Sequence, residues 1–181
     1  MNMNYCMECG TLLHPKAHGD EGLVPYCETC GAFRHPVFST AVSLLVMDEA
    51  KEHIILIRQY GKPHYILVAG YVNQGEDAED AARRELMEEL GLTAKSVTFN
   101  RSRYFSPSNT LMLNFTVTVD SADAHPNEEV DDWRWFTIPE ARGAIKPDSL
   151  AGAFLLGWCD GEYRFPVYGK AQRGSDKTQN T

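Results

Sequence analysis

The sequence predicts an α/β protein in which a layered domain of strands and helices follows a small cysteine-rich segment. Two observations carry this prediction. Short apolar runs of strand length recur from Ser39 onward, and a long helical pattern at residues 77–90 stands between them. A second helical pattern, at residues 149–158, closes the domain. Strands interleaved with helices are typical of a sheet covered by helices.

Six segments of strand length are expected in the layered domain. They are residues 41–47, 53–58, 65–69, 95–104, 111–119 and 132–136. Residues 111–119 give the clearest signal, because apolar and polar side chains alternate from Leu113 onward. The helix at residues 77–90 is rich in Ala, Glu, Arg and Leu, lacks internal Gly and Pro, and has Gly91 as its stop signal.

The composition limits the classes of function. The chain has 181 residues and a formal net charge of −8, from 17 basic and 25 acidic residues. This balance argues against a wide nonspecific nucleic-acid surface. An acidic protein that handles phosphates needs local positive charge, and a divalent metal ion is the obvious source. No apolar run approaches the about 20 residues of a membrane helix, and no secretory signal is recognisable, so we expect a cytoplasmic protein.

Four of the five cysteines form two C-x-x-C pairs. Cys6 pairs with Cys9, and Cys27 with Cys30, with 17 residues between the pairs. Each pair makes a tight turn that aims two thiolates at one point, so two pairs complete a closed tetrahedral shell. We therefore predict a structural Zn²⁺ in a small ribbon. Two disulfides or a redox C-x-x-C are the alternatives.

Three glutamates share one face of the helix at residues 77–90. Glu85, Glu88 and Glu89 are spaced i, i+3 and i+4, which brings their carboxylates together. An exposed helix usually pairs Glu with Lys or Arg four residues on, whereas Glu85 is followed by Glu89, so we expect a cluster without an internal counter-charge. A divalent cation would reverse the cost of this repulsion, and hard oxygen ligands suit Mg²⁺ or Mn²⁺. An acidic surface helix is the alternative.

The residues around these glutamates favour the metal site. The segment at residues 70–92 matches every fixed position of the Nudix box, G-x5-E-x7-R-E-U-x-E-E-x-G-U, where U is aliphatic. The chain thus resembles the Nudix hydrolases. The resemblance implies an α/β/α sandwich around a mixed sheet and metal-dependent cleavage of a diphosphate linkage in a nucleoside-diphosphate compound.

The resemblance also implies roles for the box residues. Glu85, Glu88 and Glu89 are the expected catalytic residues. Glu85 and Glu89 are expected to hold Mg²⁺ or Mn²⁺ with a backbone carbonyl of Ala69 or Gly70. Gly70, Glu76 and Arg84 are expected to support the box, the last two by tying the loop to the helix. The metal activates water, so no protein nucleophile is expected. Glu88 and Glu129 are alternative general bases.

Two further features resemble the NADH pyrophosphatase branch of this family. One is the four-cysteine ribbon ahead of the box. The other is the stretch at residues 129–136, EVDDWRWF, which is similar to the branch's E-I-x-E-A-R-W-F. This resemblance, which spans roughly residues 5–160, adds Glu129 as a metal ligand and Ala151 as a substrate-binding residue. NADH or a related dinucleotide is the implied substrate.

One segment departs from that branch. Where the branch has S-Q-P-W-P-F-P-x-S, residues 102–110 read SRYFSPSNT. We expect Tyr104 and Phe105 to stack on a base and Arg103 to meet a phosphate, although the two rings could instead cap the sheet. The departure keeps ADP-ribose or a nucleotide sugar open as the substrate. A non-catalytic binding module is the alternative of another class, and the intact box argues against it.

These observations divide the chain into three parts. We expect the zinc ribbon at residues 1–35, the Nudix hydrolase domain at residues 36–168 and a disordered polar tail at residues 169–181. The expected partner is a small nucleotide, with no membrane and with NAD-capped RNA as the one nucleic-acid candidate. Related enzymes are often dimers, so a homodimer is also an expectation.

Overall fold

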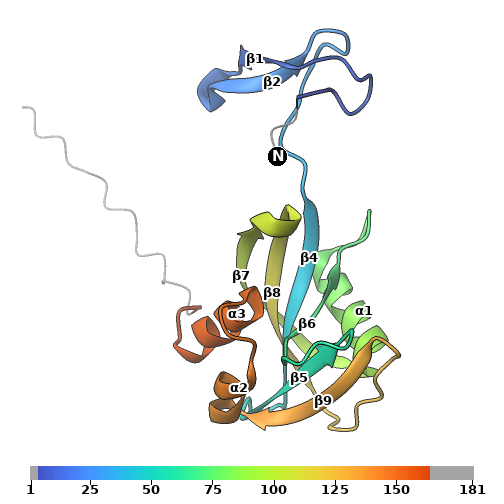
Figure 1. Cartoon of the computed structure of the whole chain (residues 1–181), viewed down its shortest axis with the longest axis vertical. Helices are drawn as coiled ribbons and strands as arrows, with labels where there is room; N and C mark the ends of the chain where they lie inside the picture. Colours follow the sequence, from blue (N-terminus) through green and yellow to red (C-terminus); the bar gives the residue numbers. More distant parts are fainter. Residues whose placement is uncertain (1–3, 164–181) are drawn as a thin grey trace, which may run out of the picture.

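The computed structural model describes residues 4–163, so the expected tail at residues 169–181 lies outside the described part. It confirms the predicted α/β class, with a mixed sheet of six strands (Figure 1). Their order is β7-β8-β4-β5-β9, with β6 also paired to β4. The pairing of β4 with β8 is parallel, and the other pairings are antiparallel. The strands are β4 (Ser39–Met47), β5 (His53–Gln59), β6 (Val68–Tyr71), β7 (Ala94–Phe105), β8 (Thr110–Val119) and β9 (Val130–Thr137).

Helices cover both faces of this sheet. The helix α1 (Ala78–Leu90) buries Leu86 and Leu90 in one core, with alternate residues of β4, β5 and β8. On the other face, α2 (Ile138–Ala144) and α3 (Leu150–Cys159) contribute to a second core. The two helical layers lie on opposite sides of the strands (Figure 1). No helix among residues 4–163 is long and apolar enough to cross a membrane.

The boundaries of α1 follow the predicted signals. The helix ends at Gly91, whose φ of 64° is left-handed and whose N–H donates to the Met87 carbonyl. At the other end, Glu79 and Asp80 place negative charge in the first turn, where it stabilises the helix dipole. The helix therefore has fixed ends, and its glutamates are held at defined positions over the sheet.

The helix α2 is an element that the sequence analysis missed. It has seven residues and begins with Ile138-Pro139, where proline suits the first turn. Thr137 and Glu140 form a capping box, in which the Glu140 carboxylate accepts from the Thr137 N–H at 2.9 Å. A helix of two turns is too short for a periodic apolar pattern, which explains the omission.

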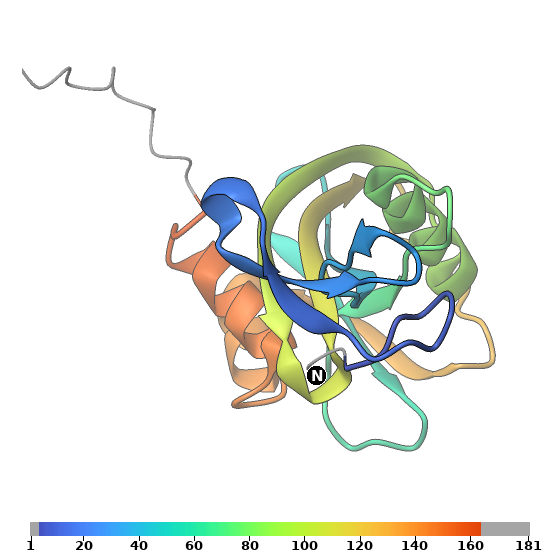
Figure 2. The same cartoon turned by 90° about the horizontal axis from the view of Figure 1, so that it is seen from above.

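The cysteine-rich segment forms a separate three-stranded sheet of β1 (His14–Ala17), β2 (Leu23–Cys27) and β3 (Ala32–Phe33), with a short 3-10 turn, η1 (Gly19–Glu21). Figures 1 and 2 show it beyond the end of the large sheet at which β4 begins. Within residues 4–38 just three side chains are buried, those of Cys6, Val24 and Cys27. The segment therefore lacks an apolar core of its own.

Candidate functional site

A cavity of about 400 Å³ opens between α1, β6 and the loops that precede β9 and follow β5. Four of the eleven residues in its wall are acidic, and all four are glutamates that the sequence singled out. Its lining consists of Tyr60, Ala69, Gly70, Tyr71, Asn73, Arg84, Glu85, Glu88, Glu89, Asn127 and Glu129. The structure thus brings the box glutamates together with Glu129, which lies 40 residues further along the chain.

Gly70 makes room for the first of these glutamates. A Cβ atom at residue 70 would lie 1.9 Å from the carboxyl carbon of Glu85, a distance at which no two such atoms can coexist. The Glu85 carboxylate therefore rests directly on the backbone of β6 at Gly70. The side chain of Glu85 is 12% exposed, against 55% for Glu88, so the two carboxylates differ in their access to water.

Glu89 lies deepest of the three helical glutamates. It is 4% exposed, and its Oε2 atom is buried without a hydrogen-bond partner among residues 4–163. Burial raises the pKa of Glu89 to about 8; the nearby Gln59 amide opposes this shift, and the negative charges of Glu85, Glu129 and Glu88 add to it. A buried carboxylate oxygen with nothing to bind is costly, and a cation in the cavity would remove this cost.

Arg84 ties the loop before α1 to the helix. Its guanidinium donates to both Glu76 carboxylate oxygens at 2.8 and 2.9 Å and to the Tyr71 carbonyl at 2.9 Å. The Arg84 guanidinium, helped by the Asn73 N–H, lowers the pKa of Glu76 to about 2. Glu76 therefore stays ionised and holds the loop in place.

The same arginine corrects one expectation about the cluster. Arg84 Nη1 also lies 2.7 Å from Glu85 Oε1 and 3.0 Å from Glu88 Oε2. The expectation of a cluster without an internal counter-charge is thus wrong for Glu85 and Glu88. The expectation considered only the residue four positions after Glu85. Arg84 is adjacent to Glu85, where the rule for helical ion pairs does not apply, and it lies four residues before Glu88, where the rule does apply. Glu89 has no such cationic partner in the described part of the chain.

The expected substrate residues lie elsewhere on the sheet. Arg103, Tyr104, Phe105 and Ala151 are absent from the cavity lining. Arg103 pairs with Met112, Met112 with Ala41, and Ala41 with Tyr71. Residues opposite each other in neighbouring strands share a face, so these four form a row across the sheet.

This row lies on the face of the sheet opposite to α1 and runs from β6 to the far strand. Met112 packs against the core under α2 and α3, and so does Ala151, which places the row on that face. Tyr71, at the near end, is exposed and borders the cavity. Arg103, at the far end, has a buried Nε without a hydrogen-bond partner among residues 4–163. Three strand spacings of about 4.8 Å make the row about 14 Å long.

Tyr104 and Phe105 lie on opposite faces of the sheet, because successive strand residues alternate. Phe105 pairs with Thr110 and shares the face of Arg103. Tyr104 packs edge-on against Phe38, with ring centroids 6.3 Å apart, and its hydroxyl donates to Asn109. The strand geometry therefore separates the two rings that the sequence analysis treated as one stacking platform.

The four cysteines of the ribbon converge. Their sulfur atoms lie within 4.8 Å of one another. The Cys9–Cys27 and Cys6–Cys30 sulfur pairs are 3.4 and 3.9 Å apart, well beyond the about 2.05 Å of a disulfide. Arg34 Nε donates to the Cys6 sulfur at 3.2 Å. Burial opposes ionisation of Cys6, but backbone N–H donors and Arg34 lower its pKa to about 6. This arrangement is suited to a metal ion.

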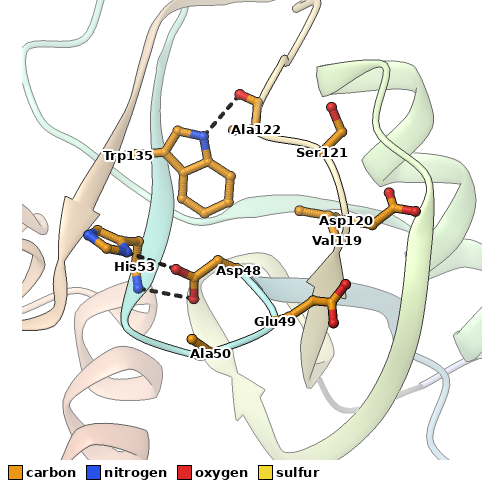
Figure 3. Close-up of a pocket in the computed structure, with 9 residues that line it drawn as sticks. All are labelled: Asp48, Glu49, Ala50, His53, Val119, Asp120, Ser121, Ala122 and Trp135. Carbon is orange, nitrogen blue, oxygen red and sulfur yellow. Dashed lines mark hydrogen bonds and ion pairs between the residues drawn. The ribbon is translucent and has the colours of Figure 1, made fainter.

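A second cavity, of about 550 Å³, lies at the other end of β5 (Figure 3). Two pairs of its polar groups are joined by hydrogen bonds. His53 Nδ1 and Asp48 Oδ2 are 2.7 Å apart, and the indole N–H of Trp135 donates to the Ala122 carbonyl at 3.1 Å. The glutamate cavity differs because it contains a buried carboxylate oxygen without a partner. We therefore place the candidate site at the glutamates.

Several residues of the site were missed by the sequence analysis. They are Tyr60, Tyr71, Asn73 and Asn127. Tyr71 directly follows the first glycine of the box at a position that the pattern leaves open. The other three lie in loops, and their approach to the cavity depends on pairings that are not local in the sequence.

Comparison with known proteins places these features in a family. Residues 37–153 match the NUDIX domain family. The NAD-capped RNA hydrolase NudC of Chromobacterium violaceum is 30% identical over 157 residues, covering 86% of this chain and 58% of that protein. NudC of Stutzerimonas stutzeri is 31% identical over 150 residues, covering 81% and 52%. The chain thus spans just over half the length of these relatives.

Solved structures show the same fold. A NUDIX hydrolase from Nitrosomonas europaea superposes with a TM-score of 0.60 at 18% identity, covering 88% of this chain and 94% of that one. At this identity the likeness shows the fold alone. The match over residues 37–153 covers most of the chain and contains the whole glutamate-bearing helix. The chain therefore belongs to the Nudix family.

Proposed function

We propose that the protein hydrolyses the diphosphate linkage of a nucleoside-diphosphate compound with the help of Mg²⁺ or Mn²⁺. The observation that carries this proposal is the buried, unpartnered Oε2 of Glu89 in a cavity that Glu85, Glu88 and Glu129 also line. The residues fit such an ion, since hard oxygen donors converge there and Gly70 leaves space for Glu85. Glu85, Glu89 and Glu129 would hold it, together with the Ala69 carbonyl.

A bound divalent cation supplies positive charge for the diphosphate oxygens and lowers the pKa of a water molecule. The chain's own residues prepare the site for this chemistry. Arg84 and Glu76 fix the loop and the helix relative to each other, and Arg84 orients Glu85. Glu88 and Glu129 are our two alternative candidates for the general base; both line the cavity, and Glu88 is more than half exposed there.

For the substrate we propose NADH or a related dinucleotide. The relatives at about 30% identity are named as hydrolases of NAD-capped RNA, which supports an NAD-type ligand and keeps NAD-capped RNA among the substrates. The row from Tyr71 to Arg103 supports a substrate that extends beyond its diphosphate, because a base can stack on Tyr71 and an anionic group can meet Arg103. Phe105 and Ala151 lie on the same face.

ADP-ribose or a nucleotide sugar is the second candidate. It is favoured by residues 102–110, which depart from the pattern of the NADH pyrophosphatase branch. The experiment that separates the candidates is a substrate panel of NADH, NAD, ADP-ribose, nucleotide sugars and NAD-capped RNA. The ratio of kcat/KM values decides, and a tenfold preference for ADP-ribose would reverse the proposed order.

For the ribbon we propose a structural Zn²⁺ held by Cys6, Cys9, Cys27 and Cys30. Four converging thiols without a disulfide support it, and a four-sulfur shell leaves no open position for a substrate. Free thiols also suit the reducing cytoplasm, where we place the protein. A homodimer is the proposed assembly, to be tested by the mass in solution.

A further inference from the structure

The residues that follow β5 contact the acidic segment at residues 128–131, which carries Glu129 and leads into β9. The register of β5 with β9 shifts between Arg58 and Gln59, and Tyr60 follows with a left-handed φ of 55°. Bulges of this kind occur next to active sites, where they redirect a side chain. Just beyond this irregularity the Tyr60 hydroxyl lies at the cavity, where it donates to Glu129 Oε2 at 2.8 Å.

A second contact anchors the same segment. The Gly61 N–H donates to Asp131 Oδ2 at 2.7 Å, so two successive residues after β5 hold the carboxylates of Glu129, just before β9, and Asp131, within β9. A non-glycine residue with a left-handed φ is uncommon and persists where the surroundings stabilise it. These two hydrogen bonds provide that stabilisation and fix the Tyr60 side chain relative to Glu129.

The hydrogen-bond donor to Glu129 is a neutral phenol, which affects the charge of the cavity. Glu129 adds a negative charge to a cavity that already contains Glu85, Glu88 and Glu89, and its field contributes to the raised pKa of Glu89. A cationic donor such as Arg84 would hold Glu129 but would also neutralise it. The phenol of Tyr60 is neutral, so it holds the carboxylate and leaves its charge intact. Glu129 Oε1 has no hydrogen-bond partner in the described part of the chain and stays available to a ligand.

We propose that Tyr60 is a positioning residue for a divalent cation. Its hydroxyl holds Glu129 beside Glu89 against the mutual repulsion of the carboxylates, and this sets the affinity of the cavity for the metal. The proposal rests on the proposed function, in which Glu129 is a metal ligand. It assigns a role to a residue outside the Nudix box.

The test is the Kd for Mn²⁺ of the full chain without substrate, measured by the electron paramagnetic resonance of free Mn²⁺. Tyr60→Phe removes the hydroxyl and keeps the ring. Loss of a group that orients a ligand typically weakens metal binding about 10-fold or more, so we expect about a 10-fold higher Kd. Tyr71→Phe is the matched control, because Tyr71 borders the same cavity and its hydroxyl has no hydrogen bond to the described residues. Its Kd for Mn²⁺ should equal that of the wild type.

A double mutant separates positioning from a general structural effect. If the hydroxyl acts through Glu129, Tyr60→Phe should change Kd little once Glu129→Gln is present. Thermal unfolding of metal-free Tyr60→Phe should match the wild type, because this hydroxyl is exposed. A Kd within twofold of the wild type, an equal shift in both Tyr→Phe variants, or an undiminished effect beside Glu129→Gln would each overturn the proposal. A wild type that binds no Mn²⁺ would instead refute the proposed function itself.

Discussion

Gly70 and Glu85 are in direct contact, and a methyl group at residue 70 would overlap the Glu85 carboxyl group at 1.9 Å. The overlapping atoms are at the end of a flexible side chain, which can turn away. We therefore predict that Gly70→Ala keeps the fold and loses the metal site, because the displaced carboxylate no longer faces Glu89. Activity at fixed Mn²⁺ should fall by orders of magnitude, while the melting temperature should change little.

Gly143→Ala is the matched control for this substitution. A Cβ at Gly143 would meet no atom within 4 Å, and the residue lies inside α2, where alanine favours the helix. We expect wild-type activity and unchanged or slightly raised stability. If Gly70→Ala is as active as Gly143→Ala, the contact between Gly70 and Glu85 has no role in the site.

The raised pKa of Glu89 predicts an unusual dependence of stability on pH. In the metal-free protein this pKa is about 8, against an ordinary value of 4.5. Between these values the folded state retains a proton that the unfolded state has released, so this group's contribution to stability falls as the pH rises from about 4.5 to about 8. Glu89→Gln removes this dependence. The variant should melt at a higher temperature than the wild type at pH 8, and the difference should shrink at pH 5.

The measurement is thermal unfolding in a metal chelator across this range. A difference in melting temperature that is the same at pH 5 and pH 8 would show that Glu89 titrates normally. Excess Mn²⁺ provides the control, because a bound cation should stabilise the wild type at pH 8 and have little effect on the variant.

The row from Tyr71 to Arg103, on the face of the sheet covered by α2 and α3, predicts which residues determine substrate specificity. Arg103→Gln removes the cation, and Phe105→Ala removes an exposed ring on the same face. Both substitutions should reduce kcat/KM, mainly through a higher KM. For Phe105→Ala the loss should correspond to about 1–3 kcal/mol of binding free energy. Steady-state kinetics with NADH and ADP-ribose provide the check. Unchanged kcat/KM on every substrate would mean that these side chains merely cover the sheet.

We predict that the fold of the ribbon depends on zinc, whereas the fold of the Nudix domain does not. Its few buried residues leave metal binding, worth on the order of 10 kcal/mol, as its main source of stability. Cys6→Ser combined with Cys9→Ser should unfold residues 4–38, seen as fast hydrogen exchange, and leave the large sheet protected. Cys159→Ser is the control, because this residue lies on α3, outside the cluster. Freshly purified protein without zinc, with its four thiols in disulfides, would contradict the assignment.

Much of the fold is readable from local signals in the sequence. The helix α1 and its stop at Gly91 follow from composition and capping, and β8 follows from strict alternation. Register is not local, so the apolar run predicts a strand at residues 65–69, whereas β6 is Val68–Tyr71. The extent of β6 is set by its pairing with β4, which no short-range pattern encodes.

The site also contains residues that local patterns predict and residues that only long-range contacts bring into place. Glu85, Glu88 and Glu89 were identifiable because a helix with known periodicity brings them together. Tyr60 was not, because its place in the cavity depends on a bulge and on a hydrogen bond to a residue 69 positions away. The separation of Tyr104 from Phe105 follows from strand geometry once the strand is known, and the expected strand at residues 95–104 ended between them.

The most direct test of the central claim is the hydrolysis of NADH by the purified chain, with products separated by chromatography. We predict cleavage into two mononucleotides in Mg²⁺ or Mn²⁺, no cleavage in chelator, and turnover reduced by orders of magnitude in folded Glu89→Gln. If NADH is not a substrate, the same comparison applies to the best compound of the panel. Full activity in metal-free buffer, or near-normal turnover by Glu89→Gln, would contradict a metal-dependent diphosphate hydrolase at this site.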